Sequence, residues 1–337
     1  MNKRIRNILQ YLFFLGLGVL FAWLSLKNLD QDKTDTIKKA FDNAKHWLII
    51  PVFGILLLSH YVRALRWRLL MEPLGYNSSK LNAFFAVMIG YLVNQGVPRL
   101  GEVVKCTVLS RYEKIPVDKL IGTIILERIV DAVTLLVIFG ITLLIQPDLY
   151  SRIIDTFFHS EAGKEESSVS YTLITLILLG IAFVALLIWM YLKKKTVGDV
   201  LGIVKKVGSR IAEGVGAVRH LKKRWSFLFL TLALWTLYFL GGYMGFMAFQ
   251  ETEQYGVREA FTVLSAGSIG MVASPGGIGA YAFMIEKTMQ LYGLSQPIAI
   301  AFGWILWLAT TAVIVTGGII SFVLIPYYNK KRLLEKT

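Results

Sequence analysis

Three charged residues, Glu127, Arg128 and Asp131, lie close together in an otherwise apolar stretch of this 337-residue chain. In a helix, spacings of three and four residues place the side chain of Asp131 beside both Arg128 and Glu127. A charged residue at the centre of a membrane helix costs about 2.5 to 3.5 kcal/mol on insertion scales, so it normally pairs or faces a hydrated cavity. The simpler interpretation is an ion pair between Arg128 and Asp131 that fixes helix packing. The other is a charged transport path.

The first interpretation leaves Glu127 without an assigned partner. Basic residues elsewhere in the chain that could hold this carboxylate are Arg66, Arg99 and Lys105. A carboxylate at that depth could also exchange a proton.

Residues 98–105 combine a helix break with charged side chains. The break frees backbone N–H groups at the start of a helix, and Arg99, Glu102 and Lys105 lie within or just after it. Free amides together with cations are typical of an anion site. The alternative is a polar hairpin tip at the cytoplasmic headgroup layer.

Arg66 belongs to a basic cluster with Arg63 and Arg68 at the end of an apolar stretch. Most such clusters are interface anchors, because long basic side chains reach the headgroup layer. If Arg66 points inward instead, it would meet a lipid phosphate.

A second break, at residues 275–279, contains Pro275, Gly276, Gly277 and Gly279. Several glycines permit backbone to approach a ligand or a neighbouring helix closely, and the following helix presents its positive dipole end. The block therefore predicts either a phosphate site or tight helix packing. About two turns later, Glu286 is a candidate for an outer gate, or for an interface pair with Lys287.

Composition places these residues in a membrane. Hydrophobic residues make up 55% of the chain and charged residues only 17%, with a mean hydropathy of +0.58. Soluble globular chains carry about 25% charged residues, so an ordinary soluble domain is excluded. One cysteine and four scattered histidines indicate no disulfide, no metal site and no cofactor, and the sequence lacks a phosphate-binding P-loop and a GxSxG elbow.

A helix needs roughly 20 apolar residues to cross a bilayer. Six segments of this kind are predicted, at residues 8–26, 47–62, 117–145, 171–192, 227–249 and 298–325. Two shorter apolar stretches, 83–97 and 260–273, each precede one of the breaks. They predict re-entrant helical hairpins, which are tolerated where they are buried or line a cavity. We therefore expect an all-α polytopic membrane protein with six spanning helices and two re-entrant hairpins.

The distribution of charge predicts the orientation. With both hairpins returning to their own side, the predicted cytoplasmic segments hold 26 Lys and Arg against 7 Asp and Glu, and the outer segments hold 9 against 13. The positive-inside rule then places both termini in the cytoplasm. Full crossings in place of each hairpin would give the same parity.

The order of elements predicts an inverted repeat within a single membrane domain, residues 1–337. The halves, about 1–145 and 171–325, contain the same elements turned over, as in transporters whose site lies at the repeat interface. Ten basic and two acidic residues between 193 and 224 accompany valines at helical spacing. Residues 197–224 therefore predict an amphipathic helix on anionic lipid of the cytoplasmic leaflet, rather than a nucleic-acid site.

Four blocks, at residues 66–68, 98–105, 127–131 and 275–279, resemble the lysylphosphatidylglycerol synthase transmembrane region, also called the flippase-like domain family of bacterial and archaeal membrane proteins. The resemblance covers nearly the whole chain. It implies an all-helical fold and movement of a lipid or lipid-linked headgroup between leaflets. Full-length synthases add a soluble aminoacylating domain, whereas only 12 residues follow Ile325 here, so no enzymatic activity is expected. The glutamate that the family often carries near Ala282 is absent, and Glu286 is a substitute one turn later.

The leading hypothesis is translocation of an anionic phospholipid or lipid-linked headgroup across a bacterial inner membrane. Arg66, Arg99 and Lys105 would receive the headgroup, the 276–279 turn would bind it from the other side, and the 127–131 cluster would set the charge of the path. Two alternatives stay open: a secondary transporter or channel for a soluble anion, and a non-transporting membrane partner of a soluble synthase or glycosyltransferase.

Overall fold

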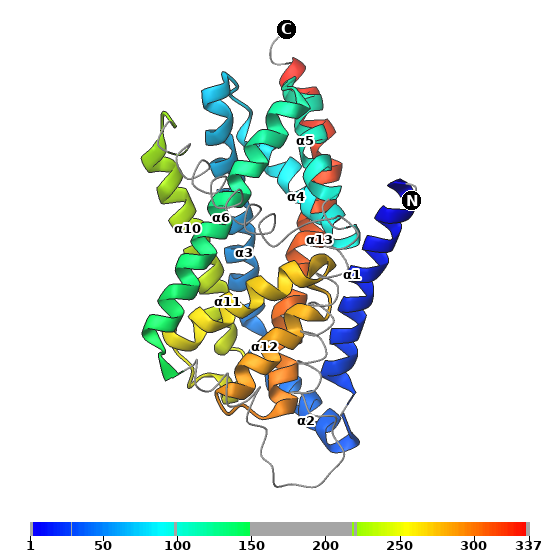
Figure 1. Ribbon diagram of the computed structural model, residues 1–337, viewed down its shortest axis with the longest axis vertical. Coiled ribbons are helices and arrows are strands. Elements are labelled where there is room, and N and C mark those ends of the chain that lie inside the picture. The colour runs from blue at the N-terminus through cyan, green and yellow to red at the C-terminus, as the bar shows by residue number, and fades with distance from the viewer. Residues whose placement is uncertain (1–2, 28, 98–99, 149–217, 219–220, 335–337) are drawn as a thin grey trace, which may run out of the picture.

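Helices form the regular structure of the part of the chain described by the computed structural model, which comprises residues 3–27, 29–97, 100–148, 218 and 221–334 (Figure 1). No strand occurs in those residues. In chain order the α-helices are α1 (Lys3–Leu26), α2 (Gln31–Asp42), α3 (Ile49–Met71), α4 (Lys80–Gly96), α5 (Leu100–Glu113), α6 (Val117–Ile145), α10 (Arg224–Phe246), α11 (Val257–Ala273), α12 (Ala280–Leu291) and α13 (Gln296–Leu334). Single 3-10 turns occur at η1 (His46–Leu48), η2 (Glu72–Leu74), η3 (Gln250–Thr252) and η4 (Pro275–Gly277).

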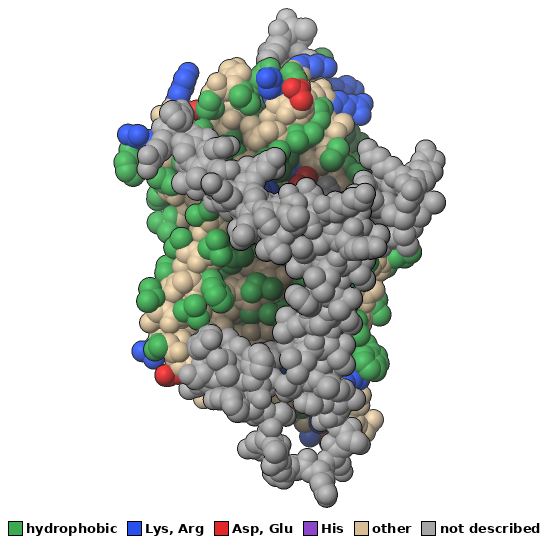
Figure 2. Space-filling model, in the orientation of Figure 1, with side chains coloured by type: hydrophobic (Ala, Val, Ile, Leu, Met, Phe, Trp, Pro, Cys, Tyr) green, Lys and Arg blue, Asp and Glu red, His purple; other side chains and the backbone are tan. Residues whose placement is uncertain are grey.

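Four helical segments are long and apolar enough to cross a membrane: His46–Leu74, Val117–Ile145, Arg224–Phe246 and Gln296–Arg332. A fifth candidate is the pair Leu12–Leu26 and Gln31–Asp42, which is bent by 99°. These segments coincide with five of the six predicted spans. The remaining one, 171–192, and nearly all of the predicted amphipathic segment lie outside the described residues. On the coloured surface in Figure 2, hydrophobic side chains are frequent at mid-height, and Lys and Arg gather near the upper end. The chain is a multi-pass membrane protein.

Both predicted hairpins are present as antiparallel helix pairs at opposite ends of the molecule. Figure 1 draws α4 and α5 in the half that holds the C-terminus, and α11 and α12 in the other half. Helices α3 and α13 run toward the C-terminal end, whereas α6 and α10 run away from it. The inverted repeat stays a prediction, because the span 171–192 of its second half lies outside the described residues. Entry and exit of each hairpin by one face of a bilayer stays a prediction.

The first hairpin is held by very close backbone contact. A Cβ atom added to Gly101 would lie 1.9 Å from the carbonyl oxygen of Gly90, so α4 and α5 touch at two glycines. The Gly101 N–H donates to Asn94 Oδ1 at 2.8 Å, which satisfies one of the free amides in the first turn of α5.

The second hairpin turns through left-handed backbone. Gly276, Gly277 and Gly279 have φ values of +57°, +70° and +70°, a region that glycine reaches without a steric penalty. The tip meets the first hairpin, since a Cβ on Gly276 would lie 1.6 Å from Oε1 of Gln95. Trp307 Nε1 donates to the Gly276 carbonyl at 2.9 Å. The glycines thus make tight packing contacts, as one of the two interpretations predicted.

Substituting Gly276 by alanine is expected to lower the stability of the fold by about 1 to 3 kcal/mol, the usual cost of a strained backbone conformation, in addition to the overlap with Gln95. The midpoint of SDS-induced unfolding in mixed micelles measures the change. Adding Gln95→Ala should restore only the steric part. Gly54→Ala on α3, where a Cβ would meet nothing within 4 Å, is the matched control, and equal midpoints for the two glycine variants would contradict the contact between the tips.

Candidate functional site

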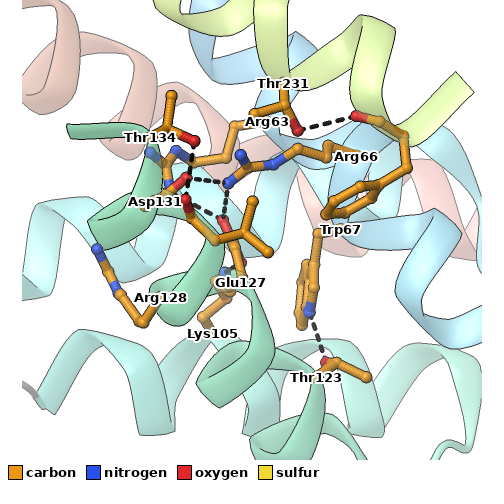
Figure 3. A network of polar contacts seen from close by, with 12 residues as sticks. Arg63, Arg66, Trp67, Lys105, Thr123, Glu127, Arg128, Asp131, Thr134 and Thr231 are labelled. Atoms are coloured by element: carbon orange, nitrogen blue, oxygen red, sulfur yellow. Dashed lines mark hydrogen bonds and ion pairs between the residues drawn. The ribbon is translucent and has the colours of Figure 1, made fainter. Parts of the chain in front are cut away.

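A buried network of five charged side chains joins α3, α5 and α6 (Figure 3). Arg63 Nη1 lies 2.8 Å from Glu127 Oε1 and 2.8 Å from Asp131 Oδ2. Arg66 Nη2 lies 2.6 Å from Asp131 Oδ1 and 3.4 Å from Glu127 Oε1. Lys105 Nζ lies 3.0 Å from Glu127 Oε2. Each carboxylate is therefore held by two or three cations.

Helical spacing explains why these residues meet. Arg63 and Arg66 are three residues apart on α3, and Glu127 and Asp131 are four apart on α6, so each pair lies on one face of its helix. Lys105 follows Gly101 by one turn of α5. The close contact of the first hairpin thus sets the depth at which the Lys105 ammonium reaches Glu127.

Aromatic side chains close the network from one side. The Lys105 ammonium lies 4.2 Å from the centroid of the Trp67 ring, and Trp67 Nε1 donates to Thr123 Oγ1 at 2.8 Å. The Arg66 guanidinium lies 5.8 Å from the Phe227 ring of α10. Rings beside cations add favourable electrostatic contact while they exclude water. The charges consequently interact in a medium of low dielectric constant.

The network is not neutral. Arg63, Arg66 and Lys105 carry three positive charges, whereas Glu127 and Asp131 carry two negative charges. In addition, Arg66 Nε and Nη1 are buried and have no partner among the described residues. Because an uncompensated buried charge is costly, a further anion beside the network would be favourable.

A second ion pair lies at the edge of the network. Arg128 Nε is 2.8 Å from Glu102 Oε1, and their side chains are 47% and 34% exposed. Arg128 points away from the network in Figure 3. A pair this accessible is able to exchange partners at little cost.

A cavity of about 460 Å³ lies beside the network, among α3, α4, α6, α10, α11, α12 and α13. Its wall is mainly apolar. Charged side chains occur where it meets the network, namely Arg63, Arg128 and Asp131. This size and composition are typical of ligand sites in proteins.

Comparison of the sequence with known proteins identifies a family. The sequence profile of the lysylphosphatidylglycerol synthase TM region matches residues 7–318. The chain belongs to this family. A UPF0104 membrane protein of Methanocaldococcus jannaschii is 27% identical over 128 residues. That match covers 37% of this chain and 36% of the relative, so the chain spans about a third of the relative's length in the match. No solved structure matches the chain.

Four of the predicted site residues in this member of the lysylphosphatidylglycerol synthase TM family share the buried network: Arg66, Lys105, Glu127 and Asp131. The partners expected for Glu127 include two that bind it, Arg66 and Lys105. The predicted pair of Arg128 with Asp131 is wrong. Asp131 faces α3 and binds Arg63 and Arg66, whereas Arg128 points toward α5 and binds Glu102.

The other predicted residues lie elsewhere. Arg99 falls outside the described residues. Pro275, Gly276, Gly277 and Gly279 form the tip of the second hairpin and are not part of the cavity wall. Glu286 is buried against α1, where Ser25 Oγ donates to its Oε2 at 2.5 Å, and Lys287 lies 3.0 Å from its Oε1. Glu286 pairs with Lys287, as the interface interpretation predicted.

Sequence reasoning missed Arg63 as a site residue and did not consider His60, Tyr91 or Tyr238. Arg63 Nε donates to Tyr238 Oη at 3.3 Å, and all four residues contribute to the cavity wall. Their spacing could have indicated two of them. His60, Arg63 and Arg66 follow one another at intervals of three residues, which places all three on one face of α3.

Proposed function

We propose that this chain moves an anionic phospholipid or lipid-linked headgroup between the leaflets of a bacterial inner membrane, with both of its termini in the cytoplasm. One observation carries the proposal: a buried network with excess positive charge borders a mainly apolar cavity inside the membrane domain. The charge suits a phosphate, and the apolar wall suits the parts of the lipid next to it.

Two arginines, Arg63 and Arg128, lie at the charged end of the cavity, where each could bind a phosphate. Arg63 is fully engaged by Glu127, Asp131 and Tyr238, whereas Arg128 is half-exposed and binds only Glu102 among the described residues. We expect Arg128 to bind the phosphate first by leaving Glu102. Arg63 would then exchange a carboxylate for a phosphate oxygen, so that the headgroup never lacks cationic partners.

The acyl or prenyl chains would stay in the bilayer. Val272 of α11 belongs to the cavity wall and is also 80% exposed, so the wall continues to the outer surface of the helices. This continuity favours a lipid over a soluble anion. The two alternatives are a transporter for a soluble anion and a non-transporting partner of a soluble synthase or glycosyltransferase. The transfer assay described below distinguishes them from lipid translocation.

The proposal requires no covalent chemistry and no cofactor from this chain. Transport would be downhill or ion-coupled. Anionic lipid of the cytoplasmic leaflet is proposed as a further partner, through residues 197–224.

Arg128→Gln is expected to lower the rate of headgroup transfer about ten- to a hundredfold, because it removes one charge-assisted hydrogen bond to the phosphate. The measurement follows fluorescent phosphatidylglycerol in liposomes that contain the purified chain, with dithionite quenching of the outer leaflet. Arg111→Gln is the matched control, because Arg111 is exposed on α5 and does not contribute to the cavity. Equal rates for both variants and the unaltered chain would remove the proposed path. Chloride or phosphate flux without lipid transfer would establish the soluble-anion alternative.

A further inference from the structure

Neutral hydrogen-bonding groups surround the cavity in addition to the charges at its end. Three tyrosines, Tyr91 of α4, Tyr238 of α10 and Tyr281 of α12, contribute to its wall. Tyr91 and Tyr281 are half-buried, and the hydroxyl of each is able to donate and to accept a hydrogen bond. The Tyr238 hydroxyl accepts from Arg63 Nε and has its own proton left to donate.

Two further side chains in the wall have unsatisfied polar atoms. His60 is 5% exposed and Trp235 is 8% exposed, and both ring nitrogens of His60 and Nε1 of Trp235 lack a partner among the described residues. The His60 ring lies 4.9 Å from the Tyr91 ring, centroid to centroid, which brings these two polar groups together. Buried polar groups are normally hydrogen-bonded, so the unpaired nitrogens of His60 and Trp235 indicate a ligand that supplies the bonds, and the three tyrosine hydroxyls add further donors and acceptors to the same wall.

The chemistry of these groups restricts the ligand. A neutral imidazole presents one donor and one acceptor, an indole presents a donor, and a phenol presents both. Phosphate oxygens in their ionised form only accept, so they cannot satisfy the imidazole acceptor. A hydroxyl both donates and accepts, and it therefore matches all five side chains.

An amine in the headgroup would not be matched. The only carboxylate in the described cavity wall is Asp131, and both of its oxygens are already bound by Arg63 and Arg66. Arg63 and Arg128 would repel an added ammonium at the same end. The wall therefore favours hydroxyls over amino groups.

We propose that the cavity binds a sugar-phosphate or polyol-phosphate headgroup. The phosphate contacts Arg63 and Arg128, and the hydroxyls of the headgroup contact Tyr91, Tyr281 and His60. The aromatic rings of Trp235 and Tyr281 provide apolar faces for the carbon skeleton of a sugar. This inference rests on the proposed function and gives it a substrate class.

The experiment compares binding of defined ligands to the full chain in nanodiscs. Native mass spectrometry gives relative affinities for phosphatidylinositol, phosphatidic acid and phosphatidylethanolamine, and for water-soluble inositol 1-phosphate. We expect phosphatidylinositol to bind at least tenfold more tightly than phosphatidic acid, which has the phosphate without the hydroxyls. Weakest binding is expected for phosphatidylethanolamine. Inositol 1-phosphate binding as tightly as phosphatidylinositol would assign the same chemistry to a free sugar phosphate and overturn the lipid source.

Variants that remove single polar groups connect the preference for phosphatidylinositol to the named side chains. Tyr281→Phe and Tyr91→Phe should each lower the preference for phosphatidylinositol over phosphatidic acid roughly three- to tenfold and leave phosphatidic acid binding unchanged, because one hydrogen bond is lost. His60→Phe should act similarly. Tyr243→Phe is the matched control, since Tyr243 stacks on Phe239 of the same α10 helix and does not contribute to the cavity.

The outcomes separate this inference from the proposed function. Equal binding and equal transfer of all anionic phospholipids, in the unaltered chain and in the tyrosine variants, would overturn the hydroxyl-bearing substrate class while transfer itself stands. Preferential binding of phosphatidylethanolamine would also overturn it. Absence of transfer for every lipid, with inositol-selective binding intact, would overturn the proposed function and leave the ligand class supported.

Discussion

Glu127→Ala is expected to destabilise the folded chain by about 3 to 5 kcal/mol, the range measured when one partner is removed from a buried ion pair. Glu127 is 1% exposed and is the only partner of the Lys105 ammonium among the acidic residues in the described part of the chain. Its removal leaves three buried cations with one carboxylate. The midpoint of unfolding by SDS in mixed micelles reports the loss, together with the yield of monodisperse protein.

A second substitution tests whether charge causes the loss. Glu127→Gln also removes the negative charge and should destabilise the chain. In that background, Lys105→Met removes one cation and fills a similar volume, so it should recover part of the stability that Glu127→Gln loses. Asp118→Ala is the matched control, because Asp118 is an exposed acid on the same helix. A double variant less stable than Glu127→Gln alone, or an equal loss for Asp118→Ala, would contradict the role assigned to the network.

The membrane-spanning helices were predictable because the bilayer imposes a length and a composition on each of them. The segments 117–145 and 298–325 coincide with α6 and with the interior of α13. The breaks before α5 and between α11 and α12 likewise follow from proline, which interrupts a regular helix, and from glycine, which weakens one. These signals are local in the sequence, so no knowledge of the neighbouring helices was needed to find the two hairpins.

The partners within the charge network were less predictable, because they depend on how helices are rotated about their axes. Spacing along α6 placed Arg128 and Asp131 near each other, but their side chains diverge toward α5 and α3. The rotation of α3 likewise directs Arg63 and Arg66 toward the carboxylates of α6. A basic cluster near the end of a membrane helix normally extends to the lipid headgroups instead. Only the packing of α3 against α6 decides between these directions.

The glycine block shows a further limit. Its sequence predicted unusual backbone, and three of its glycines have positive φ. The neighbours that require those glycines come from distant segments, with Gln95 against Gly276 and Gly18 against Gly279. A single sequence does not reveal such contacts, and it could not distinguish tight packing from a phosphate site.

Gly101→Ala is expected to displace α5 and thereby disturb the charge network from one turn away. The added Cβ would lie 1.9 Å from the Gly90 carbonyl oxygen and 2.6 Å from Asn94 Cγ. Because the first of these atoms is backbone, no side-chain rotation relieves the overlap, and we expect the full cost of overpacking, about 1 to 3 kcal/mol, or more. The unfolding midpoint in mixed micelles measures this cost.

Function should fall further than stability alone predicts, because α5 also carries Lys105 and Glu102. A shift of α5 away from α4 changes the contacts of both residues with α6, and the transfer rate should drop together with the unfolding midpoint. Gly96→Ala is the matched control in the same hairpin, since a Cβ there would meet nothing within 4 Å. If Gly101→Ala and Gly96→Ala gave equal midpoints and equal transfer rates, the depth of Lys105 would not depend on the contact between Gly90 and Gly101. The first hairpin would then not be the element that positions this side of the network.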